Sequence, residues 1–181
     1  MEKESILMKD PEGRGNTEAV MDHILSWTFK MCNESNNKEK TNYALLIECR
    51  KILSKLIGVD ITYDNCEVKA YMQWEKIDLV VEVVLQNGES HAVLIENKVK
   101  SDLPEHELKD NKIKFKKHYD NDGSIQWYQH FWLIHAYNVD DYMINQCNVD
   151  GYKYITLDEL SHSSGPDLGN DIFDEFWRRK W

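Results

Sequence analysis

The chain has 181 residues, of which 41% are hydrophobic and 11% aromatic, and its formal net charge is -10 at pH 7. This length and composition suffice for the core of one folded domain and exclude a disordered chain. No apolar run approaches the roughly 20 residues that cross a bilayer and the first residues lack a signal-peptide pattern, so we expect one cytoplasmic domain over residues 1–181 with no membrane partner.

The N-terminal third predicts a loose arm followed by two helices. Pro11, Gly13 and Gly15 interrupt the start of the chain, so we expect residues 1–15 to form a flexible arm. Asn16 or Thr17 can cap a first helix, and after a polar loop a second helix runs until Gly58 stops it. The apolar stripes are Val20, Ile24, Trp27 and Met31 in the first helix and Leu45, Cys49, Ile52, Leu53 and Leu56 in the second.

The rest of the chain predicts strands and helices. Apolar runs between turn residues indicate strands, and charged periodic segments indicate helices. We expect strands at about residues 67–75, 77–85, 91–99, 127–137 and 152–157, and helices at about residues 103–119 and 171–181. Since no repeat or linker divides the chain, this order predicts a single α/β (α+β) domain, with a central mixed sheet of about four to five strands flanked by helices.

Residues 77–99 predict a β-hairpin, and its turn decides where three charged residues lie. If residues 87–88 alone formed the loop, Asp78 and Glu96 would face opposite sides of the sheet. A three-residue loop over 86–88, with Gly88 in the left-handed conformation, instead puts Asp78 directly opposite Glu96. This register is favoured because it gathers the apolar residues on one face, namely Leu79, Val81, Val83, Leu85, Val93 and Ile95.

Asp78, Glu96 and Lys98 then share the other face. Charges at the ends of buried strands are costly unless they are paired or bind a metal. Two close carboxylates repel each other unless a cation neutralises them, and oxygen ligands suit Mg²⁺ or Mn²⁺. Lys98 can orient a water or stabilise charge on a phosphate, so the three residues indicate metal-dependent phosphodiester hydrolysis.

This arrangement resembles the active-site hairpin of the PD-(D/E)XK nuclease superfamily, which has the restriction-endonuclease-like fold. The string Ile77-Asp78, the later Leu94-Ile95-Glu96-Asn97-Lys98-Val99 and the following Asp102 are similar to a bacterial branch with an ENK motif. The resemblance covers residues 68–119 most closely. It implies that Asp78 and Glu96 bind the metal together with the backbone carbonyl of Asn97, and that Lys98 is the catalytic lysine.

The resemblance also suggests a further carboxylate from an N-terminal helix. Glu48 borders the apolar face of its helix, which makes it a candidate catalytic residue, and the alternative is an ordinary boundary residue paired with a lysine. Glu18 lies opposite its helix's stripe and is less favoured. The family further implies a nucleic-acid partner, with DNA favoured over RNA, a homodimer that cuts both strands, and a role in defence or mobile-element biology.

The lysine-rich helix is the expected nucleic-acid contact. Between residues 98 and 117 the lysines exceed the acidic residues, although the whole chain is acidic. The candidate phosphate contacts are Lys100, Lys109, Lys112 and Lys116. The alternative is a solvated helix surface with i,i+4 ion pairs.

Two functional classes remain open. The first is a nuclease dependent on Mg²⁺ or Mn²⁺. The second is a catalytically inactive module of the same fold that binds nucleic acid or a protein, which the acidic charge and Glu107, at a position where relatives usually have glutamine, would fit. The four cysteines are far apart and indicate neither a zinc site nor a disulfide framework.

Overall fold

The computed structural model describes residues 4–8, 16–36, 43–99, 106–121, 123–139, 141–161 and 165–180. Most of the predicted flexible arm lies outside these ranges. Residues 4–8 are not loose, because the amide of Ser5 donates to the carbonyl of Lys180 (2.8 Å) and Met8 is buried. Within the described ranges, no helix is long and apolar enough to span a membrane.

The core is a mixed five-stranded sheet in the order β1-β2-β3-β4-β5. The first three strands are antiparallel, and β4 and β5 continue the sheet in parallel. The strands are β1 (Cys66–Trp74), β2 (Ile77–Leu85), β3 (Ser90–Lys98), β4 (Trp127–His135) and β5 (Lys153–Thr156). The predicted mixed sheet flanked by helices is confirmed.

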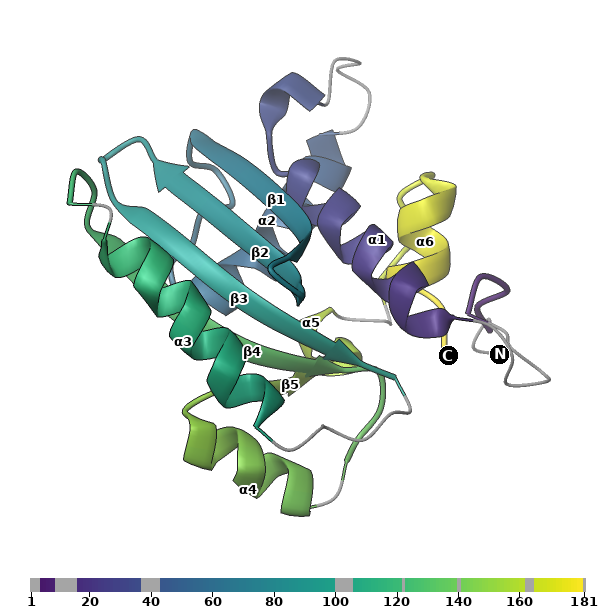
Figure 1. Cartoon of the computed structure of the whole chain (residues 1–181). Coiled ribbons are helices and arrows are strands. Elements are labelled where there is room, and N and C mark those ends of the chain that lie inside the picture. Colours follow the sequence, from purple (N-terminus) through teal and green to yellow (C-terminus); the bar gives the residue numbers. More distant parts are fainter. Residues whose placement is uncertain are drawn as a thin grey trace.

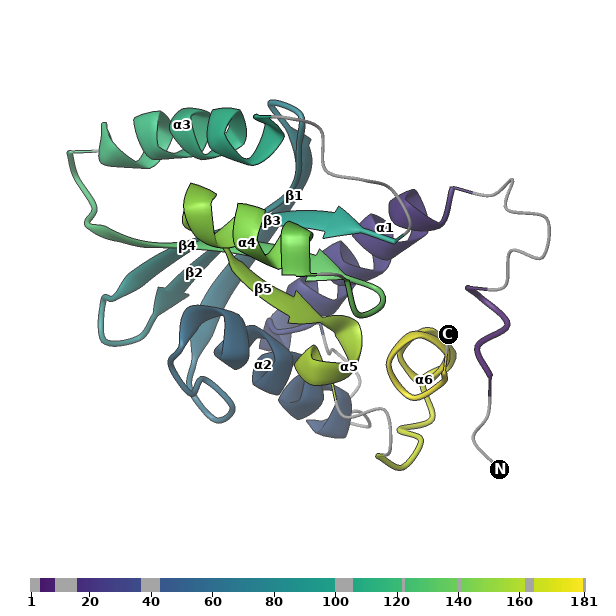
Figure 2. The same ribbon diagram turned by 90° about the horizontal axis from the view of Figure 1, so that it is seen from below.

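Helices cover both faces of the sheet (Figures 1 and 2). One face packs against α1 (Thr17–Lys30), α2 (Tyr43–Ile57), α5 (Leu157–Leu160) and α6 (Asp171–Trp177), and this side holds the larger hydrophobic core. The other face packs against α3 (Glu107–Asp120) and α4 (Asp141–Asp150). A short 3-10 helix, η1 (Glu34–Asn36), follows α1. Asn16 caps α1, since its side chain accepts from the amide of Ala19 (3.0 Å).

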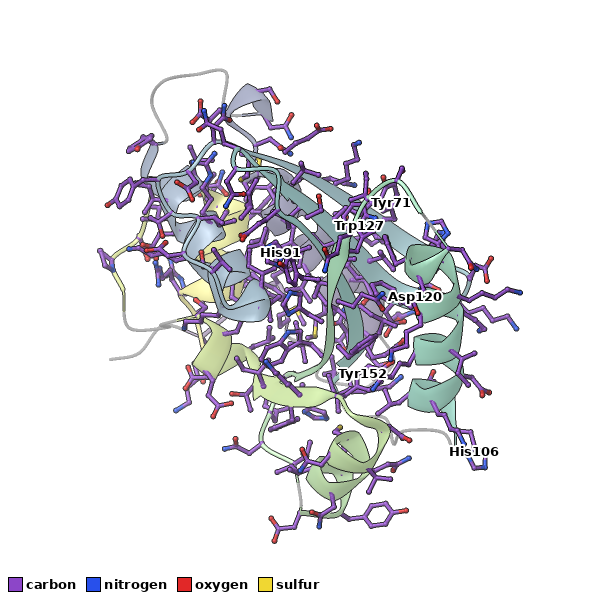
Figure 3. The ribbon with its side chains drawn as sticks, turned by 90° about the vertical axis from the view of Figure 1, so that its left-hand side faces the viewer. Tyr71, His91, His106, Asp120, Trp127 and Tyr152 are labelled. Atoms are coloured by element: carbon purple, nitrogen blue, oxygen red, sulfur yellow. The ribbon has the colours of Figure 1, made fainter. Side chains whose placement is uncertain are left out.

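Polar contacts tie α3 to the sheet and its neighbours. The hydroxyl of Tyr152 donates to the carbonyl of Leu108 (2.9 Å), and Asp120, at the other end of α3, accepts from Gln129 (2.6 Å). Figure 3 shows Tyr152 and Asp120 beside α3, whereas His91 lies farther from that helix, in register with Val83.

All four cysteines are free and buried.

The β2–β3 hairpin has the predicted register. Leu79 pairs with Ile95 at the end of the ladder, and the same register continued by one residue puts Asp78 opposite Glu96. Leu85 and Glu89 close the loop through a 2.9 Å hydrogen bond, and Gly88 has φ +89°, which a side chain would strain. The prediction of a three-residue loop is confirmed.

The outer edge of β1 is partly covered by a side chain. Asn33, just after α1, accepts from the amide of Val68 (2.8 Å) and donates to the carbonyl of the same residue (2.8 Å). Its amide therefore takes the hydrogen bonds that a neighbouring strand would otherwise make.

Candidate metal and catalytic site

Two carboxylates and a lysine meet where β2 begins and β3 ends. Asp78 and Glu96 are opposite each other on neighbouring strands, and Lys98 lies on the same face because it is two residues further along β3. Glu96 is fully buried, Lys98 is 8% exposed and Asp78 is half-buried. The structure thus brings together the three residues that the sequence predicted.

Asp78 is held through both of its oxygens. Oδ2 accepts from the backbone amide of Asn97 (2.9 Å), and Oδ1 lies 3.4 Å from the side-chain amide of Gln73. The carbonyl of Lys98 accepts from Ala136 on the β4 side. Since successive residues of a strand direct their backbone groups to opposite sides, the carbonyl of Asn97 is directed toward Asp78, as its predicted role as a metal ligand requires.

Glu96 has few hydrogen-bond partners that would stabilise its carboxyl group in the ionised form. Its Oε1 accepts from the side-chain amide of Asn111 on α3 (2.7 Å), whereas its Oε2 accepts no hydrogen bond from the described residues. Burial, followed by the neighbouring charge of Asp78, raises the pKa of Glu96 to about 9. A divalent cation between the two carboxylates would remove this penalty.

Lys98 is charged and faces a third carboxylate. Its Nζ lies 3.4 Å from Oε2 of Glu107. Burial alone would lower the pKa of Lys98, but Glu107, Asp78 and other carboxylates outweigh it and raise the pKa above its ordinary value. Glu107 therefore contacts the candidate catalytic lysine directly, at the position where the resemblance expects a glutamine.

Helix α1 contributes two carboxylates that were not chosen from the sequence. Oδ1 of Asp22 accepts from the side-chain amide of Asn97 (2.7 Å), and Oε1 of Glu18 accepts from the amide of Val99 (3.1 Å). Burial raises the pKa of Asp22 to about 6, and Asp78 adds to this rise against the hydrogen bond from Asn97. The sequence feature that could have pointed to Asp22 is a second apolar row on α1, which is buried and lies beside Asp22. This row consists of Met21, Leu25 and Phe29 and differs from the predicted stripe.

The donor set fits a hard divalent cation bound by few side chains. Among the described residues, no group of three or more His, Cys, Asp or Glu side chains is arranged to hold a metal. The predicted set needs only two, Asp78 and Glu96, with the Asn97 carbonyl and water completing the shell. The buried Oε2 of Glu96, which accepts no hydrogen bond from the described residues, agrees with that set.

Glu48 does not belong to this site. It lies on α2, against the opposite face of the sheet, and pairs with Lys51 (2.7 Å) and Arg178 (2.5 Å). Although burial raises its pKa, the hydrogen bonds from these two cations outweigh burial and lower the pKa below the ordinary value. The predicted catalytic role of Glu48 is therefore wrong, and its pairing with a lysine is confirmed.

The predicted phosphate-binding lysines have different environments. The ammonium of Lys112 donates to the carbonyls of Asp150 (2.7 Å) and Gly151 (3.1 Å) and lies over the Phe131 ring, so it already has partners within the protein and its phosphate contact stays a prediction. Lys109 and Lys116 are exposed on α3. Lys100 lies outside the described residues.

Comparison with known proteins found no matching family model, no matching curated protein and no matching solved structure. The nuclease interpretation therefore depends on the residues of this chain and their geometry.

Proposed function

We propose that this protein is a divalent-metal-dependent nuclease that hydrolyses phosphodiester bonds, with Mg²⁺ or Mn²⁺ as its cofactor. The observation that carries the proposal is the pair Asp78 and Glu96, which face each other across two strands with Lys98 beside them. Glu96 is fully buried, and burying an acidic group with a partner of the same charge is costly for a purely structural site.

Each residue has a distinct part in the proposed reaction. Asp78, Glu96 and the Asn97 carbonyl would hold the cation, which when bound supplies an activated water and polarises the phosphate. Lys98, kept charged by the surrounding carboxylates, stabilises the negative charge that develops on the phosphate. Asn111 orients Glu96 through their 2.7 Å hydrogen bond, and Asp22 orients Asn97 through another.

The substrate and setting are proposed on the resemblance and on surface charge. DNA is favoured over RNA, and the exposed Lys109 and Lys116 are available to contact phosphates. Lys100 stays a predicted contact outside the described residues. A homodimer would allow both strands of a duplex to be cut. The four buried free thiols support a reducing compartment such as the cytoplasm, where defence or mobile-element functions would operate.

A catalytically inactive binding module is the second candidate. The observation that favours it is the ion pair between Lys98 and Glu107, which engages the proposed catalytic ammonium. In an active enzyme, this ion pair must break when substrate binds, or Lys98 must contact Glu107 and the substrate at the same time.

The deciding experiment combines metal titration with cleavage of varied DNA and RNA in Mn²⁺, in Mg²⁺ and in EDTA. We expect Mn²⁺ binding to the wild type, metal-dependent cleavage, and loss of both in Asp78→Ala. A wild-type protein that binds no divalent ion at millimolar concentration and cuts no substrate would support the binding module instead.

A further inference from the structure

The turn between β1 and β2 has an unusual backbone. Glu75 and Lys76 form a two-residue loop with φ +50° and +75°, and Gln73 before it has φ +53°. Two-residue hairpin loops with both residues left-handed normally use Asn-Gly, because side chains strain this conformation. This loop has no glycine, so the surrounding structure must hold it in place.

Helix α3 holds the turn. The ring of Trp74 packs edge-on against His118, with 4.9 Å between ring centroids, and Nζ of Lys114 donates to the carbonyl of Glu75 (3.3 Å). The same ammonium donates to Oδ1 of Asn111 (3.2 Å), whose amide binds Glu96. One chain of contacts therefore joins the strained turn to the candidate site.

Gln73, two residues before this loop, contacts Asp78. Its neighbours Met72 and Trp74 pair with β2, whereas Gln73, which would face Asp78, drops out of the ladder. Its side-chain amide lies 3.4 Å from Oδ1 of Asp78.

We infer that Gln73 is a positioning residue for Asp78, and that the strained turn serves to hold its amide at this carboxylate. Asp78 is then fixed from both sides, by the Asn97 amide on Oδ2 and by Gln73 on Oδ1. Each carboxylate oxygen retains a lone pair for a cation. The inference rests on the proposed metal-dependent function and extends it to a residue on a different strand.

Three variants separate the amide from the backbone strain. Gln73→Ala removes the amide and keeps the strained backbone, and Gln73→Gly removes the amide and relieves the strain. Lys76→Gly relieves strain in the same turn and leaves the amide at Asp78. Loss of a residue that orients a metal ligand typically weakens metal binding by about 10- to 100-fold.

The measurement is Mn²⁺ affinity by isothermal titration, with thermal unfolding of each variant as the check on folding. We expect both Gln73 variants to bind Mn²⁺ about tenfold more weakly than the wild type, and Lys76→Gly to bind as the wild type does. Wild-type affinity in Gln73→Ala and Gln73→Gly would overturn the inference, as would an equal loss in Lys76→Gly.

A second measurement does not depend on metal. In EDTA, the unfolding midpoints of Gln73→Ala, Asp78→Ala and the double variant form a thermodynamic cycle. We expect the two substitutions to be non-additive, and additivity would overturn the contact. If the wild type binds no Mn²⁺ while the cycle shows coupling, the proposed function fails and Gln73 remains the partner of Asp78.

Discussion

Glu96 has a carboxyl group at a position where an uncompensated negative charge is costly. Its pKa is raised from 4.5 to about 9 in the folded protein, first by burial and then by Asp78. The folded state therefore binds a proton more tightly than the unfolded state. The stability from this group is fully present below pH 4.5 and is lost as the pH rises through about 9, and Asp22, with its pKa raised to about 6, adds a loss of the same sign.

We therefore predict that the metal-free protein becomes less stable between about pH 5 and pH 9. Glu96→Gln should flatten this dependence, because the amide cannot ionise, and Mn²⁺ should raise the stability of the wild type most at high pH, because the cation binds ionised carboxylates. Urea unfolding at several pH values, in EDTA and in Mn²⁺, measures both effects. An unchanged slope in Glu96→Gln would assign the pH dependence to other groups.

Lys98→Ala tests the catalytic assignment. Removal of a charge that acts in the transition state typically costs about 3 kcal/mol, or roughly a hundredfold in rate. We expect this loss in the cleavage assay, with Mn²⁺ affinity close to that of the wild type. Lys30→Ala, at the exposed end of α1, is the control for loss of a positive charge. Cleavage by Lys98→Ala at the wild-type rate would contradict a catalytic role, and the ion pair with Glu107 would then be the remaining role of Lys98.

The site was predictable from sequence only where its geometry is local. The opposition of Asp78 and Glu96 follows from alternation along a hairpin whose apolar residues must share one face. Asp22 and Asn111 could not be found in this way, because their contacts depend on how two helices dock on the strands. Glu48 was misassigned for the same reason: its place at the edge of an apolar stripe does not reveal which face of the sheet the helix covers.

At the level of elements, the lysines of α3 differ in their environment. Lys112 donates to backbone carbonyls within the protein, whereas Lys109 and Lys116 are exposed. We predict that Lys112→Met lowers the free energy of unfolding by about 1–2 kcal/mol, because two backbone carbonyls lose a charged donor. We also predict that Lys109→Glu with Lys116→Glu leaves stability nearly unchanged but weakens DNA binding and flattens its salt dependence by about one unit of log–log slope per lost contact.

Chemical denaturation and DNA binding measured across a salt series distinguish the two sets. Lys112→Met serves as the comparison for binding, since its ammonium already donates to Asp150 and Gly151. DNA affinity that falls equally in all of these variants would contradict the division of the helix into two sets.

Helix α4 is the main element that the sequence did not predict. Only Cys147 is buried in its ten residues, so no apolar stripe marks it, and Tyr142 and Val149 are among its exposed side chains. The five strands were predictable because each combines apolar alternation with bounding turn residues. Helices that lie at the margin of the core carry a weaker pattern.

At the scale of the whole molecule, we expect the Asn33 side chain, which covers the edge of β1, to limit self-association. Asn33→Ala would leave the amide and the carbonyl of Val68 without their side-chain partner and should lower stability by about 1–2 kcal/mol. It should also promote association at high concentration, because an uncovered strand edge can pair with another chain. Sedimentation over a range of concentrations measures this, with Asn36→Ala as a neighbouring control. A sedimentation profile identical to that of the wild type would show that the edge is protected in another way.

The contacts of the candidate site come from both layers of helices. Asn97 receives its partner Asp22 from α1, on one face of the sheet, and Glu96 receives Asn111 from α3, on the other. A chain emerging from the ribosome makes Asp22, Asp78 and Glu96 before it makes α3. Until α3 has packed, Glu96 lacks Asn111, the residue that orients it, and until α1 has packed, Asn97 lacks Asp22. If the proposed nuclease function holds, this order would delay cleavage until both layers of helices have packed on the sheet.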